Sequence, residues 1–344
     1  MKKISKTFII GTFLFAAITC APQASAVSKT ATAAAQFLKI GVGPRAVALG
    51  GSFSGLANDA SALYWNPAGA VWINGGHFQA MHNEWFADIN HEFLGLVVPF
   101  SPAGSFGLSM ISLTAPEMEQ TTIEQPDGTG IYFDVQDIAI GLTYSRKLTE
   151  RFSFGLTGKY VQQRIFNETA TTLALDLGGM LRTGFYGMKL GIAMNNFGGK
   201  LRMQGRDLLV SYDDQPGLGG NPLTSAALET QEWPLPTSFR IGLAVDLIGP
   251  GEGFIQREAQ RLTLLADGYN VNDAAETMSL GLEYSWNEYF FLRGGYRINH
   301  DLETFSAGTG IQVPLQRWML QADYAISSMG DLGYIHRMGL GFRF

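Results

Sequence analysis

The feature that most constrains this chain is a side-chain polarity of period two, repeated in segments of about ten residues. In segment 239–247, Phe, Ile, Leu, Val and Leu at the odd positions alternate with Arg, Gly, Ala and Asp at the even ones. Segments 152–160 and 278–286 repeat the pattern. Successive side chains of a β-strand point to opposite sides, so each segment predicts a strand with one apolar face and one small or polar face.

Two observations favour a membrane β-barrel over a soluble β-sandwich, in which the apolar faces would meet in a core. First, aromatic residues sit at segment ends on the apolar face, as in the interfacial girdles of membrane barrels. They are Tyr144, Tyr160, Tyr284, Trp286, Tyr296 and Trp318. Second, the opposite face carries Gly, Ala and Ser as often as Lys or Glu, which suits a lumen packed with protein better than a surface in water. After residue 26 no apolar run approaches the ~18 residues of a membrane helix, so a closed barrel is the expected membrane form.

The segments predict an all-β fold, a transmembrane antiparallel β-barrel of about 14 strands over residues 75–344. The expected strands are 75–84, 91–100, 104–114, 133–146, 151–164, 170–182, 185–196, 237–248, 261–270, 276–286, 289–299, 304–314, 317–327 and 334–344. Short connections, as expected on the periplasmic side, follow the even-numbered strands, and the long connections 115–132 and 198–236 fall on the extracellular side. Connection 249–260 is an exception, since it is long and falls on the short side. The apolar content of 198–236 suits a lid, a docking face or simple packing over the barrel mouth.

The last segment alternates strictly and ends the chain with Phe342 and Phe344 on its apolar face. A final strand that ends in Phe resembles the signal by which bacterial outer-membrane barrels are recognised for insertion. We therefore expect Phe342 and Phe344 to serve as an insertion signal, with an ordinary terminal strand as the alternative.

Residues 1–26 have the three parts of a signal peptide: a basic start, an apolar core at 8–18 and an Ala-Ser-Ala cleavage site at 24–26. The chain is therefore expected to be exported to the bacterial outer membrane. Cys20 follows a poor lipoprotein box, and its lipidation is the alternative. If cleavage follows Ala26, the mature chain has no cysteine, which excludes disulfides, thiol nucleophiles and Cys-based metal sites.

Residues 27–74 do not alternate as strands do, and they are rich in Ala and Gly. Asn58 or Asp59 is a plausible N-cap for a short helix over 60–64, and Pro67 is expected to end that helix. Small residues pack closely and polar ones can meet lumen charges. The segment is therefore expected to form a hatch inside the barrel.

The hatch segment carries a run of residues that resembles the N-terminal signature of the PorV/PorQ family of outer-membrane proteins, which is related in fold to the FadL-type transporters. The matching positions are Arg45, Ala46, Gly50, Gly51, Phe53, Asn58, Asp59, Ala62, Trp65, Asn66, Pro67, Ala68 and Gly69. The resemblance implies a barrel of fourteen strands with an N-terminal hatch. In Bacteroidetes-type bacteria it also implies a part in type IX secretion, with secreted protein cargo and secretion-system proteins as partners.

Three functions remain open on the sequence. The first is a PorV/PorQ-type secretion component, and the barrel, shorter than most FadL-type chains, favours it. The second is a FadL-like channel for hydrophobic small molecules, which predicts an apolar pocket between hatch and wall and a lateral gap. The third, an enzyme, would need an acid–base or nucleophile cluster, and the sequence shows no such motif.

The charges of the alternating segments are expected to face the lumen, since a charge on the lipid face near the midplane costs about 2–4 kcal/mol. These residues are Lys159, Asp176, Arg182, Arg240, Asp246, Glu283, Arg293, Arg297, Asp323, Arg337 and Arg343. They can pair with one another or with Arg45, Asn58 and Asp59, and either hold the hatch or line a polar route. The five histidines lack metal-ligand spacing, so no metal or cofactor is expected, and the net charge of −6 gives no case for nucleic acid as a partner. The barrel is expected to be embedded in outer-membrane lipid.

Overall fold

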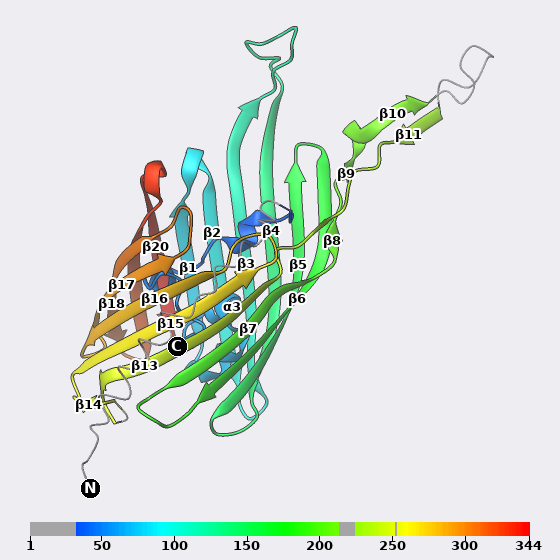
Figure 1. The fold of residues 1–344 in the computed structure, drawn as a ribbon. Helices are drawn as coiled ribbons and strands as arrows, with labels where there is room; N and C mark the ends of the chain where they lie inside the picture. Colours follow the sequence, from blue (N-terminus) through cyan, green and yellow to red (C-terminus); the bar gives the residue numbers. More distant parts are fainter. Residues whose placement is uncertain (1–31, 213–223, 252) are drawn as a thin grey trace, which may run out of the picture.

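The computed structural model describes residues 32–212, 224–251 and 253–344, so the predicted signal peptide lies outside the described residues. Within these ranges, fourteen antiparallel strands form one closed sheet (Figure 1). They are β1 (His77–Glu84), β2 (Asn90–Phe100), β3 (Gly104–Glu119), β4 (Tyr132–Lys147), β5 (Phe152–Ile165), β6 (Glu168–Arg182), β7 (Lys189–Gly198), β13 (Ser238–Gly249), β15 (Gln260–Val271), β16 (Thr277–Trp286), β17 (Phe290–Ile298), β18 (Phe305–Leu315), β19 (Trp318–Ser328) and β20 (Tyr334–Arg343). Each pairs with its neighbours in chain order, and β1 closes the barrel on β20. The predicted barrel of about fourteen strands is confirmed.

The strands follow the predicted segments within a few residues, and the largest difference is at β3. We expected this strand to end at residue 114, but it continues to Glu119 through a register shift between Ala115 and Met118. The alternation fails at Pro116 and Glu117, while the ladder with β4 resumes beyond the irregularity. The β3–β4 hairpin therefore stands taller than its neighbours (Figure 1).

The two ends of the barrel differ in their connections. The end that carries the chain's entry into β1 and its exit from β20 is here called the short-turn end, and the opposite end the long-loop end. Connection 198–236 belongs to the long-loop end and adds β8 (Lys200–Leu201), β9 (Gln204–Gly205), η4 (Arg206–Leu208), β10 (Leu209–Tyr212), β11 (Thr224–Ala227) and β12 (Trp233–Pro234). The exceptional long connection at the short-turn end adds β14 (Ile255–Gln256), which pairs with β13 in parallel. Two further single turns, η3 (Phe86–Asp88) and η5 (Gly330–Leu332), lie at the long-loop end.

Exposure along the strands decides which face turns outward. On β5, Leu156 and Tyr160 are 38% and 40% exposed, whereas Lys159 between them is 5% exposed. Glu283 on β16 is fully buried. The apolar rows therefore form the outer surface and the polar rows face the interior, which excludes the soluble sandwich. No helix in the described part of the chain is long and apolar enough to cross a membrane.

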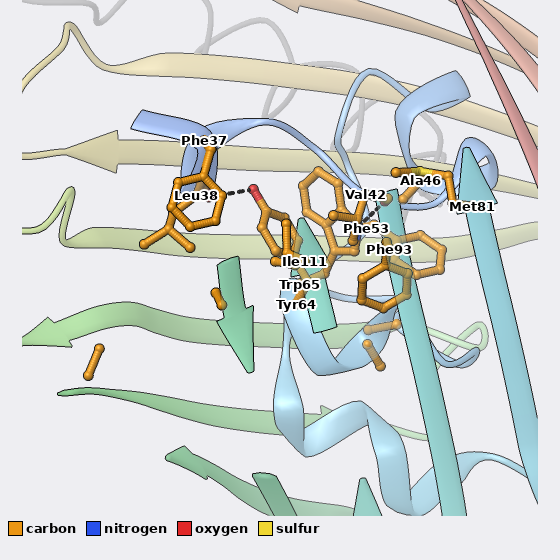
Figure 2. Close-up of a cluster of buried hydrophobic side chains, with 14 of the residues drawn as sticks. Phe37, Leu38, Val42, Ala46, Phe53, Tyr64, Trp65, Met81, Phe93 and Ile111 are labelled. Atoms are coloured by element: carbon orange, nitrogen blue, oxygen red, sulfur yellow. Dashed lines mark hydrogen bonds between the residues drawn. The ribbon is translucent and has the colours of Figure 1, made fainter. Parts of the chain in front are cut away.

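The N-terminal segment, residues 32–76, lies inside this wall and forms four short helical turns (Figure 1). They are η1 (Gln36–Lys39), α2 (Pro44–Ala48), α3 (Ala62–Trp65) and η2 (Pro67–Trp72). α2 contacts β17 to β20, while η2 contacts β3 to β6, so the segment reaches two different parts of the wall. Its buried Phe37, Val42, Phe53 and Trp65 form an apolar cluster with wall residues (Figure 2).

Inward-facing glycines let the N-terminal segment approach the wall backbone. A Cβ atom on Gly191 of β7 would collide with the carbonyl oxygen of Ser54, and one on Gly295 of β17 would collide with the amide of Gly50. The abundance of glycine on the polar faces thus follows from close backbone contact between the wall and the N-terminal segment.

Candidate functional site

Arg45 of α2 is the centre of a buried charge network between the N-terminal segment and the wall. Its Nε donates to Glu283 Oε2 at 2.7 Å and its Nη2 to Glu283 Oε1 at 2.8 Å, across 238 positions of sequence. Nη1 donates to Asn58 Oδ1 at 2.8 Å and lies 3.2 Å from Asp59 Oδ2. Burial alone would lower the pKa of Arg45, but Glu283 and Asp59 outweigh it and raise the pKa above its ordinary value.

Glu283 extends this network along the wall. It also accepts from Arg293 Nε at 2.9 Å and from Arg261 Nη1 at 3.3 Å, and Arg293 Nη1 donates to Asp323 at 2.6 Å. One carboxylate on β16 therefore faces three guanidinium groups. Of the expected pairing between lumen charges and Arg45, Asn58 and Asp59, the structure shows Arg45 with Glu283, whereas Asn58 and Asp59 contact Arg45 instead of a charge of the wall.

Asn58 and Asp59 do not cap a helix over 60–64, and this expectation is wrong. The helix α3 begins at Ala62, and its N-cap residue Ser61 forms no side-chain cap hydrogen bond. Asp59 Oδ1 instead accepts from the backbone N and the Oγ of Ser61, at 3.0 and 2.6 Å. Its other oxygen, Oδ2, faces Arg45, so Asp59 both stabilises a local turn and belongs to the charge network.

The Trp65-Asn66-Pro67 part of the motif joins the N-terminal segment to itself and to the wall. Trp65 Nε1 donates to the carbonyl oxygen of Val42 at 2.9 Å. Asn66 is extended, donates to the carbonyl oxygens of Ser54 and Gly179 at 2.9 and 3.1 Å, and caps η2 through Ala68 N. The helix α3 does end before Pro67, as expected, and Pro67 then begins η2.

Gly50 and Gly51 form a turn of positive φ against β17 and β18. Gly50 N donates to Ser306 Oγ at 3.0 Å, and Arg297 Nε donates to the Gly50 carbonyl oxygen at 3.2 Å. Eight of the motif residues are the candidate site residues of the N-terminal segment, and they contact one another or the wall: Arg45, Gly50, Gly51, Asn58, Asp59, Trp65, Asn66 and Pro67.

A pocket of about 610 Å³ opens on the outer, lipid-facing surface of β4 to β7. Its lining is mainly apolar and includes outward-facing residues of four neighbouring strands, which are Ile140, Leu142, Gly158, Tyr160, Leu173, Leu175, Phe197 and Gly198. Tyr160, which the sequence assigned to a girdle, lies within β5 and borders this pocket. Nothing lies within 4 Å of a Cβ atom placed on Gly158, so the pocket is open at this position, where a side chain is missing.

The wall behind this pocket is irregular. The β6–β7 register shifts between Leu175 and Leu177, so Asp176 leaves the regular ladder. Lys159, which also lines the pocket, places its Nζ 2.7 Å from Asp176 Oδ2 and donates to Asn196 Oδ1 at 2.9 Å. A buried ion pair with an amide therefore separates the lipid-facing pocket from the interior. Sequence analysis missed this site, because the pocket is assembled from four strands and only the missing side chain at Gly158 marks it.

A buried cluster of three polar side chains near the long-loop end was also not predicted from the sequence. Asn83 of β1 lies beside His91 of β2 and Arg337 of β20 in the ladder register. All three side chains are buried, and no described residue hydrogen-bonds the amide of Asn83 or the ring nitrogens of His91. Among the described residues, no group of three His, Cys, Asp or Glu side chains could hold a metal ion.

Phe342 and Phe344 lie at the seam where the barrel closes. Phe344 N donates to the Gly76 carbonyl oxygen at 2.9 Å, and Gly76 N donates back at 2.8 Å. The Phe342 ring packs outward beside Trp318, with the ring centroids 4.3 Å apart. Their proposed part in insertion stays a prediction.

Comparison with known proteins agrees with this fold. The model of an uncharacterised protein family, UPF0164, matches residues 13–159, and no curated protein matches the sequence. The toluene transporter TodX of Pseudomonas putida has a similar structure, with a TM-score of 0.56 and 13% identity over 88% of this chain and 97% of TodX. The toluene transporter TbuX of Ralstonia pickettii gives 0.54 and 12%, over 88% and 98%. A FadL homologue of Pseudomonas aeruginosa gives 0.50 and 14%, over 88% and 96%.

The fold and the comparisons together define the class. This chain has the fold of an outer-membrane β-barrel and is structurally similar to the FadL-type transporters.

Proposed function

We propose that this protein is an outer-membrane channel for hydrophobic small molecules, in which the N-terminal segment acts as a hatch. The observation that carries the proposal is the apolar pocket on the lipid-facing side of β4 to β7, beside the irregular β6–β7 pairing. The similar structures TodX and TbuX, which are toluene transporters, support a substrate of the same class. They are transporters, which agrees with the expectation that this chain is not an enzyme.

The position of the pocket suits an apolar solute. A molecule that leaves the interior through the wall enters hydrocarbon directly and avoids the cost of crossing water. With about 610 Å³, the pocket has the size of ordinary small-molecule sites. In this proposal Lys159, Asp176 and Asn196 form the inner barrier that must rearrange for passage. The pocket lies on the outer face, whereas the channel hypothesis expected one between hatch and wall.

The test fills the pocket without disturbing the barrel. Gly158→Trp places an indole where a Cβ atom meets nothing within 4 Å. Gly294→Trp is the matched control, since Gly294 of β17 is also free of neighbours within 4 Å and faces away from the interior. We expect Gly158→Trp to reduce uptake of radiolabelled toluene several-fold in a strain that depends on this protein, and Gly294→Trp to leave uptake unchanged.

Equal uptake by the two variants, at equal amounts of folded barrel in the outer membrane, would contradict the lateral route. Uptake unaffected by deletion of the whole protein would contradict the channel function itself.

A secretion component of PorV/PorQ type is the second candidate. The Arg45–Gly69 motif favours it, as does the β10–β11 hairpin, which projects beyond the barrel and exposes Leu209 and Tyr212 (Figure 1). Such a hairpin offers a surface for secreted protein cargo or secretion-system proteins. Loss of exported proteins on deletion, with hydrophobic uptake intact, would favour this function over the channel.

A further inference from the structure

A second cavity, of about 290 Å³, lies at the short-turn end between the β6–β7 turn and the β13–β15 connection. This connection, residues 249–260, is the long one at the end of the barrel where the other connections are short. It folds back on the barrel, because β14 pairs with β13 and the Phe254 ring stacks on Tyr186, with centroids 3.9 Å apart and an interplanar angle of 7°. The extra length therefore builds one wall of the cavity.

Positive charge predominates in the lining, where Arg182, Lys189 and Arg261 face a single carboxylate, Asp246. Lys189 Nζ lies 3.2 Å from Asp246 Oδ2, so these two charges compensate each other. Arg261 pairs outside the cavity, with Glu288 at 2.8 Å and Glu283 at 3.3 Å.

Arg182 is the third cation of the cavity lining. No carboxylate of the described residues forms an ion pair with it, and its buried Nε has no hydrogen-bond partner there. The guanidinium lies 3.7 Å from the ring centre of Trp72, which packs against it but supplies no hydrogen-bond acceptor. A buried guanidinium donor without an acceptor is costly, so the arrangement favours a ligand that supplies one.

We propose that this cavity binds a small organic carboxylate at the periplasmic mouth of the barrel, through the fork of Arg182. A guanidinium binds a carboxylate through two parallel hydrogen bonds. One uncompensated positive charge matches a monoanion better than a dianionic phosphate. The volume admits a body of the size of a benzene ring, and Met188 with several glycines provides an uncharged surround. The site is independent of the lipid-facing pocket and does not rest on the proposed channel function.

Isothermal titration of the full-length protein in detergent tests the assignment, with benzoate, the neutral benzamide and inorganic phosphate as probes. We expect saturable binding of benzoate alone. Arg182→Gln should weaken it at least tenfold. Asp246→Asn should strengthen it several-fold, because it removes the competing carboxylate. Lys147→Gln is the matched control, since Lys147 lies over the same Trp72 ring at 4.2 Å but does not line the cavity. The affinity of this variant for benzoate should stay within twofold of that of the unaltered protein.

Each other result overturns the proposal. Equal binding of benzamide would show that charge is not recognised, and tighter binding of phosphate would contradict the choice of a monoanion. The opposite signs expected for Arg182→Gln and Asp246→Asn cannot arise from general damage to the fold, and the heat-modifiable mobility of each variant reports whether the barrel has formed. Absence of benzoate binding to the unaltered protein would refute the site outright.

Discussion

The Arg45–Glu283 network predicts that one carboxylate in the wall keeps the N-terminal segment closed. Glu283→Gln preserves the side-chain volume but removes the charge that faces Arg45, Arg293 and Arg261. Removing one partner of a buried ion pair costs about 3–5 kcal/mol. Because Arg45 keeps Asp59 and Arg293 keeps Asp323, we expect the lower end, about 3 kcal/mol.

Hydrogen exchange of the protein in lipid nanodiscs, followed by mass spectrometry, measures this loss where it should occur. A cost of about 3 kcal/mol lowers the protection of amides in segment 44–59 by at least ~100-fold if they exchange by local opening. The matched control is Glu288→Gln, which removes a half-exposed partner of Arg261 that does not touch the N-terminal segment. Equal protection of segment 44–59 in the two variants would refute the idea that Glu283 holds this segment.

Two further predictions concern pH and the lipid-facing surface. Burial opposes ionisation of Glu303, in the β17–β18 loop, but Arg297, Arg337 and His300 outweigh it and lower its pKa from 4.5 to about 2. This carboxylate therefore contributes about 3 kcal/mol above pH 4.5 that is lost as the pH falls towards 2. Unfolding by urea at pH 7 and pH 3 should show a weaker pH dependence in Glu303→Gln, and an unchanged dependence would contradict the pairing. Leu156→Arg places a charge on the outer face of β5 and should cost about 2–4 kcal/mol in refolding into liposomes, whereas a change near zero would mean that this face does not touch hydrocarbon.

The strands were predictable because each one carries its own alternation, and alternation is a local property. The wall side of the charge network was also within reach, since Glu283 and Arg293 sit on polar faces that cannot turn to lipid. The pairing of Arg45 with Glu283 was not, because it joins positions 238 residues apart and depends on how the N-terminal segment crosses the interior. The motif marked Arg45 as a candidate site residue but did not identify Glu283 as its partner.

The failures have equally physical causes. Asp59 was expected to cap a helix, because Asp is a favoured N-cap, but Arg45 and the Ser61 hydroxyl compete for the same carboxylate. The extension of β3 to Glu119 needs pairing with β4, which no single segment reveals. Both cavities lie between strands or connections, so their linings combine residues with unrelated positions in the sequence.

The seam between β1 and β20 has a consequence for biogenesis. Gly76 exchanges two backbone hydrogen bonds with Phe344, and β20 follows every other wall strand in the chain, so the barrel can close only after β20 has been synthesised. Residues 32–76 lie within that barrel, and they precede every strand in the order of translation. They are therefore available to pack against the sheet before it closes, and the pairing of β1 with β20 then encloses them. The connectivity thus places the enclosed segment before the wall and the closing strand β20 after the other wall strands in the order of synthesis.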